Sequence, residues 1–159
     1  MNRHLYSFIF IFLVSILQGS AHGAQVGTTS VTFTFQAIDE IAITGSPTLI
    51  INSAVAGQQP QPAIDTLSTF SVSTNGTNKR ITAGINKQMP ANTTLEIQLT
   101  APDSGTSTGY KTLSTVATDV VTGISHVAAA NKTITYRFSA TTAAGVLTDS
   151  CTVTLTLTD

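Results

Sequence analysis

The final nine residues, Cys151–Asp159, alternate without a break between apolar and polar side chains. Cys151, Val153, Leu155 and Leu157 fall on one side of an extended chain, and four threonines fall on the other. Successive side chains of a β-strand point to opposite faces, so this pattern predicts a half-buried strand that closes the chain. No segment of useful length shows the apolar period of about 3.6 residues that an amphipathic helix requires.

Similar alternation divides most of the sequence into short strands separated by turn signals. Asn75-Gly76 supplies positive φ angles at low cost and predicts a hairpin between residues 70–74 and 81–85. We also expect the last two strands to form an antiparallel hairpin. Roughly eight or nine strands predict an all-β fold, an immunoglobulin-like or Greek-key antiparallel sandwich, with a small barrel or jelly roll as the alternative. The expected strands cover residues 31–35, 41–43, 49–51, 70–74, 81–85, 95–99, 134–138 and 151–159, with one or two more in 113–121.

The apolar side of each alternation predicts which residues fill the core. Large aliphatic and aromatic side chains are the ones most often found inside proteins. Residues 49–51 are expected to form a short buried strand. The side chains expected to be buried are those of Val31, Phe33, Phe35, Phe70, Val72, Ile81, Leu95, Ile97, Ile134, Tyr136, Phe138, Val153 and Leu155.

The N-terminal residues have the features of a secretory signal peptide. Arg3 provides positive charge, the apolar run Phe8–Leu17 is too short to span a bilayer, and Ala21-His22-Gly23 offers small residues for cleavage. We therefore expect residues 1–23 to be a signal peptide and residues 24–159 to be a single β-sandwich domain without a membrane span. An uncleaved N-terminal membrane anchor is the alternative.

Charge and cysteine content restrict the partners of the chain. The chain has seven basic and eight acidic residues, and loss of Arg3 leaves six against eight, a net charge of −2. This balance excludes a nucleic-acid binder and a basic membrane-surface module. Cys151 is the single cysteine, so no internal disulfide can form. Its alternation with Val153 predicts a buried, inert thiol, and an intermolecular disulfide or reactive thiol is the alternative.

No arrangement of residues in the sequence indicates catalysis, a metal or a cofactor. His126 is the only histidine after the predicted signal peptide, and we expect it in a surface loop, because no nucleophile motif accompanies it. Asp103, Asp119 and Asp149 occur singly in expected loops, where turn chemistry explains them better than calcium binding. The sequence therefore predicts a protein that is not an enzyme and has no cofactor or metal site.

The C-terminal strand resembles the end of bacterial WxL cell-surface domains, which close with a Trp-x-Leu-x-Asp strand. The matching residues are Leu155–Asp159, with Leu155 in the place of the tryptophan. Residues 73–83 and 89–95 are similar in style to those domains. The resemblance implies attachment to peptidoglycan at the cell surface.

More loosely, the chain resembles pilin-like surface subunits assembled by donor-strand exchange. Its size, its threonine content, the expected export and a strand-like segment at residues 25–35 are similar. That segment either pairs within its own domain, beside the C-terminal strand, or adds to the sheet of a neighbour. We expect a secreted or cell-surface structural or adhesive protein, with a filament subunit as one form. The partner would be a second copy or a cell-envelope polysaccharide. An extracellular glycan- or peptidoglycan-binding module is the alternative function.

Overall fold

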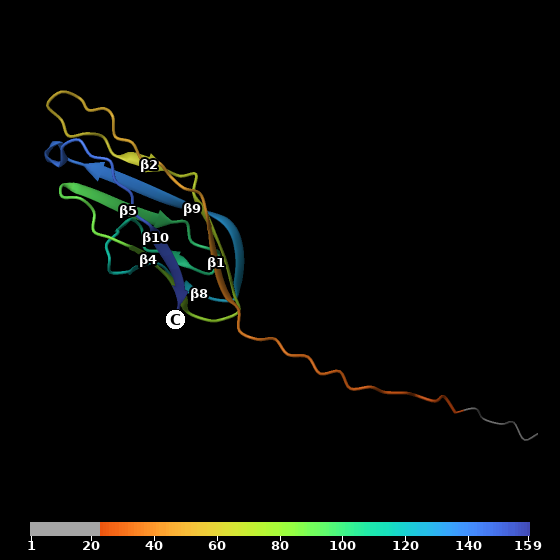
Figure 1. Ribbon diagram of the computed structural model, residues 1–159. Coiled ribbons are helices and arrows are strands. Elements are labelled where there is room, and N and C mark those ends of the chain that lie inside the picture. The colour runs from red at the N-terminus through yellow and green to blue at the C-terminus, as the bar shows by residue number, and fades with distance from the viewer. Residues whose placement is uncertain (1–22) are drawn as a thin grey trace, which may run out of the picture. The chain divides into compact units, whose positions relative to one another are not determined.

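The computed structural model describes residues 23–159, so the predicted signal peptide lies almost wholly outside the described residues. The described chain belongs to two units, a segment that ends at Thr34 and a compact unit from Phe35 to Asp159. Within residues 23–159 no helix is both long enough and apolar enough to cross a membrane. The predicted all-β class is confirmed, because the compact unit consists of antiparallel sheets (Figure 1).

Ten strands and one short 3₁₀ turn, η1 (Thr142–Ala144), make up the regular structure of residues 23–159. Every one of these strands contains threonine, valine or isoleucine, residues that pack well on a pleated surface. The strands are β1 (Asp39–Thr44), β2 (Ala63–Asp65), β3 (Thr69–Thr74), β4 (Lys79–Ile85), β5 (Thr93–Leu99), β6 (Thr106–Ser107), β7 (Lys111–Thr112), β8 (Thr118–Ile124), β9 (Val127–Ala140) and β10 (Val153–Thr158).

The strands form two sheets. The first sheet has the order β1-β3-β9-β5-β7, with β2 also paired to β9, and the second has the order β10-β4-β8-β6. Strand β9 is the longest and pairs with β3 along its first half and with β5 along its second half. The two long edge strands β1 and β10 belong to different sheets and are in contact with each other.

Both predicted hairpins are wrong, because the strands concerned belong to different sheets. β3 pairs with β1 and β9, whereas β4 pairs with β10 and β8, so residues 75–78 cross between the sheets. The amide of Asn75 bonds to Ile38 instead of closing a turn, and Asn78 takes the positive φ of 53°. β9 and β10 likewise belong to separate sheets. Within residues 23–159 every ladder joins strands that are not consecutive in the chain.

The core lies between the two sheets and is largely the one that the alternation predicts. Phe70, Val72, Ile81, Leu95, Ile97, Ile134, Tyr136 and Leu155 are buried as expected, whereas Phe138 and Val153 are only half-buried and pack against the core. Residues 49–51 do not form the predicted buried strand, since they pair with no other strand and Ile50 is 67% exposed. Three apolar residues alone did not distinguish a strand from a loop.

The largest departure from the predicted core concerns residues 31–35. Val31, Phe33 and Phe35 were expected to be buried, but they are 77%, 90% and 77% exposed. The predicted strand is also absent, because no ladder in the described chain includes any residue before Asp39. These residues have the alternation of a strand without a partner strand, and that lack of a partner is the physical reason for their exposure.

Candidate functional site

The residues considered for catalysis do not converge in the structure. His126 is exposed between β8 and β9, as predicted, and its amide donates to the carbonyl of Gly76. Asp103 and Asp149 pair with Lys132 and Lys87, and Asp119 lies within β8 beside Arg80, not in the expected loop. Among residues 23–159 no three histidine, cysteine or carboxylate side chains gather as metal ligands would.

Cys151 is half-buried and lies two residues before β10 begins, so the prediction of a buried thiol is only partly correct. The side chain packs against the core on the same side as Val153, as the alternation predicts. Burial raises the pKa of the Cys151 thiol and so favours its protonated form.

The tyrosines give limited support to a sugar site. Tyr136 is buried, and burial raises its pKa to about 12. The guanidinium of Arg137 lies 4.2 Å from the centre of the Tyr110 ring and covers one face of it. Arg137 also donates to Glu96 at 2.6 Å. The ring of Tyr110 is therefore occupied on one side by a paired cation instead of being an open platform.

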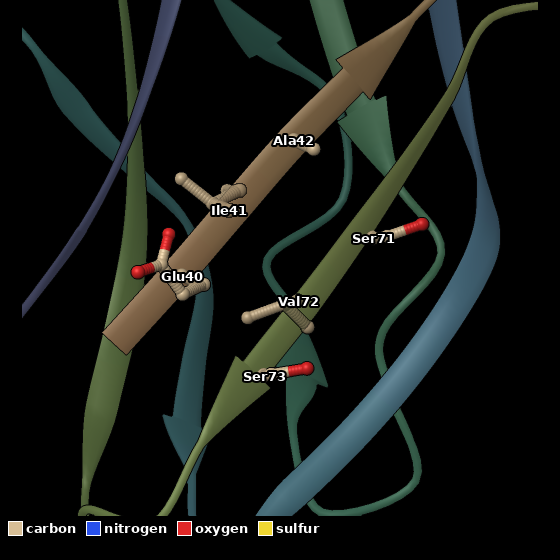
Figure 2. A pocket seen from close by; sticks show the side chains of 6 residues that line it. All are labelled: Glu40, Ile41, Ala42, Ser71, Val72 and Ser73. Carbon is tan, nitrogen blue, oxygen red and sulfur yellow. The ribbon is translucent and has the colours of Figure 1, made fainter. Parts of the chain in front are cut away.

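A shallow depression lies over the paired strands β1 and β3. Its volume is about 200 Å³, which is below the roughly 300–1,000 Å³ of most small-molecule sites. Figure 2 shows that Ile41 and Val72, which are directly paired, project to one side of the sheet, while Ser71 and Ser73 project to the other. Glu40 is the one charged residue in the lining, so the depression holds no acid–base pair.

The edge strands β1 and β10, which lie at the ends of the two sheets, are more informative than this depression, and we call them together the open edge. The amide of Asn75 donates to the carbonyl of Ile38, so these two residues form a hydrogen-bonded pair that continues the β1–β3 ladder. Along an antiparallel ladder such pairs alternate with pairs whose amides point away from the partner strand. The amides of Ile41 and Ile43 therefore point away from β3. The amide of Asn86 donates to the carbonyl of Thr152 in the same way, so the amides of residues 153, 155 and 157 point away from β4.

Inward-facing side chains at the open edge are less covered than the residues beside them. Directly paired residues of a sheet face the same side, and Ile43 pairs with Phe70. Phe70 is 1% exposed, whereas Ile43 is 42% exposed. On β10, Val153 and Leu157 are only half-buried, although their partners Ile85 and Ile81 are buried. The core is therefore incompletely covered along this side.

Lys79 closes one end of the open edge. Its ammonium lies 2.9 Å from a carboxylate oxygen of Asp39, at the start of β1, and 2.5 Å from one of Asp159, after β10. The hydroxyl of Thr74 and then the ammonium of Lys79 lower the pKa of Asp39. Asp159 and Asp39 together raise the pKa of Lys79. These contacts hold the two sheets together where β1 begins and β10 ends.

The sequence suggested pairing of residues 25–35 beside the C-terminal strand as one alternative, but it did not identify β1 and the free side of β10 together as an open edge. A signal for this edge was present in the sequence, because no charged residue occurs between Ala24 and Ile38 or between Cys151 and Thr158.

Comparison of the chain with protein-family models finds no match, and comparisons with the curated proteins and with the solved structures find no match either.

Proposed function

We propose that this chain is a non-enzymatic structural or adhesive protein of the bacterial cell surface that is exported and assembles with copies of itself, as a filament subunit does. The observation that carries the proposal is the exposure of Val31, Phe33 and Phe35 on one side of an alternating segment. Soluble proteins seldom leave such a group of large apolar side chains exposed unless the group binds something.

The composition of the segment supports strand addition as the mode of assembly. Val31-Thr32-Phe33-Thr34-Phe35 contains strand-forming residues and no charge, proline or glycine. An extended peptide that joins a sheet edge gains main-chain hydrogen bonds along its length. Burial of each phenylalanine contributes about 1.5–3 kcal/mol in addition. One segment and one open edge per copy make a head-to-tail contact, which generates a chain of subunits unless it closes into a ring.

Export is part of the proposal and has its own test. Arg3, the apolar run Phe8–Leu17 and the small residues at 21–23 support a cleaved signal peptide. Mass spectrometry of the protein in the surface fraction should find an N-terminus at Ala24 or Gln25. Retention of Met1 would contradict cleavage.

The assembly is tested with residues 24–159 by analytical ultracentrifugation and electron microscopy. The test variant carries Val31→Ser, Phe33→Ser and Phe35→Ser, and the matched control carries Thr28→Ser, Thr32→Ser and Thr34→Ser. We expect wild type and control to form concentration-dependent assemblies and the test variant to stay monomeric. At a dilution where wild type is also monomeric, the test variant and wild type should have the same melting temperature. A wild-type protein that is monomeric at every concentration would overturn the proposal.

A further inference from the structure

We infer that the site that accepts the N-terminal segment is the free edge of β10 in a second copy of the chain. This inference rests on the proposed function and adds to it the place of contact. Residues 26–35 of one copy would extend the sheet β10-β4-β8-β6 of the next copy by one strand, beside β10. Their apolar side chains would face the core and cover Ile41 and Ile43 of β1.

The lengths of the edge strands favour β1 and β10 over the other ends of the sheets. β6 and β7, at the opposite ends, are two residues long, and short edges pair poorly with an added strand. β1 and β10 are six residues long each and are the two long edges within the described chain. A strand of six residues such as 30–35 matches either of them in length.

Charge distinguishes β10 from β1 as the acceptor. β1 begins with Asp39-Glu40, and charged residues on an edge strand discourage the addition of another strand. β10 has the sequence Val153-Thr154-Leu155-Thr156-Leu157-Thr158, with no charge, proline or glycine to block it. The amides of its residues 153, 155 and 157 point outward, as the Asn86–Thr152 bond shows. β10 therefore offers an edge without the usual protection.

The uncovered side chains of β1 explain what an added strand would gain. The first sheet has five strands in its main order and the second has four. A fifth strand beside β10 would face β1 across the core. Ile43, which is 42% exposed although its partner Phe70 is buried, would then be covered by an apolar residue of the added strand. The three exposed side chains of Val31, Phe33 and Phe35 supply such residues at alternate positions.

Disulfide trapping locates the contact directly. All variants carry Cys151→Ser, and Thr32→Cys protein is mixed with Thr156→Cys protein, with Ala42→Cys protein on β1, or with Thr106→Cys protein on β6. Each of these three target positions is exposed. We expect a covalent heterodimer with Thr156→Cys, in severalfold excess over the heterodimers with Ala42→Cys and Thr106→Cys.

Other outcomes would overturn the inference, and some of them would do so without overturning the proposed function. A dominant heterodimer with Ala42→Cys would place the contact on β1. Assembly in the ultracentrifuge without excess trapping at Thr156→Cys would reject β10 and leave self-assembly standing. A double variant Thr32→Cys/Thr156→Cys that crosslinks only within monomers would show self-pairing. Absence of any assembly would overturn both the proposed function and the inference.

A second pair of variants tests the role of Ile43. Ile43→Asp places a charge where the added strand would bury it, whereas Ile64→Asp changes an isoleucine of β2 that is also exposed, at 58%. We expect Ile43→Asp to weaken self-association more than tenfold and Ile64→Asp to leave it unchanged, with both monomers folded by circular dichroism. Equal effects of the two variants would contradict a docked strand beside β1.

Discussion

The side chain of Asn75 accepts a hydrogen bond from the amide of Ile38 at 2.8 Å, while the amide of Asn75 donates to the carbonyl of Ile38 at 3.2 Å. The Nδ2 of Asn75 also donates to the carbonyl of Gln36 at 2.7 Å. One side chain thus substitutes for a β-ladder partner and fixes the chain just before β1 begins. On the other sheet, the Oδ1 of Asn86 accepts from the amide of Thr152 at 2.8 Å, just before β10 begins.

Asn75→Ala should therefore destabilise the domain, because two side-chain hydrogen bonds to the backbone are lost. We expect a loss of about 1–2 kcal/mol in the free energy of unfolding, measured by urea titration. Asn86→Ala, which loses a single bond of the same kind, is the matched control and should cost about half as much. Equal stability of Asn75→Ala and wild type would show that residues 36–38 are not held by this side chain.

Phe70→Ala and Phe33→Ala should differ strongly in their effect on stability. Phe70 is 1% exposed in the core, and large-to-small changes at such positions cost about 3–5 kcal/mol. Phe33 is 90% exposed, so its replacement should change the unfolding free energy of the monomer by less than about 0.5 kcal/mol. Urea unfolding at low protein concentration measures both. A large loss for Phe33→Ala would mean that residues 31–35 pair within their own domain.

The environment of Asp39 predicts a loss of stability in acid. The Thr74 hydroxyl and the Lys79 ammonium hold the pKa of Asp39 below its usual value of 3.8. Because the folded-state pKa is below the unfolded value, the contribution of Asp39 is complete above pH 3.8 and is lost as the pH falls through the folded-state pKa. Asp39→Asn should be less stable than wild type at neutral pH, and this difference should shrink below pH 3.8.

Asp103→Asn is the control for the acid prediction. The Asp103 carboxylate is highly exposed and lies 3.0 Å from Lys132, and exposed pairs of this kind contribute little to stability. Unfolding curves of this variant should follow those of wild type at every pH. If the difference in unfolding free energy between wild type and Asp39→Asn stayed constant from neutral pH to below pH 3.8, protonation of Asp39 would not be the cause of the loss of stability in acid.

Cys151 should react slowly with thiol reagents in the native protein. It is half-buried, and burial raises its pKa, so little thiolate is present at neutral pH. We expect the rate of labelling to rise at least tenfold on unfolding in urea, as followed by absorbance. Labelling of the native protein at the rate of the unfolded protein, or a covalent dimer that Cys151→Ser abolishes, would contradict this expectation.

Local alternation was sufficient to predict most strands and most of the core. Leu95 and Ile97, for example, alternate with polar residues and are buried between the sheets. Val31, Phe33 and Phe35 alternate just as regularly, yet they are exposed. Alternation shows that a segment suits a sheet, but it does not show which strand it pairs with, since that depends on residues far away in the sequence.

The hairpin predictions failed for a related reason. Asn75-Gly76 is a strong local turn signal, but the bonding groups of Asn75 are used by Gln36 and Ile38, almost forty positions earlier. Such a partner cannot be read from the few residues around the turn. The open edge was missed because it depends on which strands lie at the ends of the sheets, and strand order is a property of the whole fold.

The absence of ladders between consecutive strands in the described chain has a consequence for the order of events after synthesis. β4 gains its outer partner only when β10, which lies far later in the chain, has been synthesised. Loop closure over such sequence separations slows folding. Slow closure of this kind is compatible with the export that we propose, because a chain whose sheets have not yet closed can be threaded through a narrow channel. The sheet that contains β4 is completed only when β10 has been delivered.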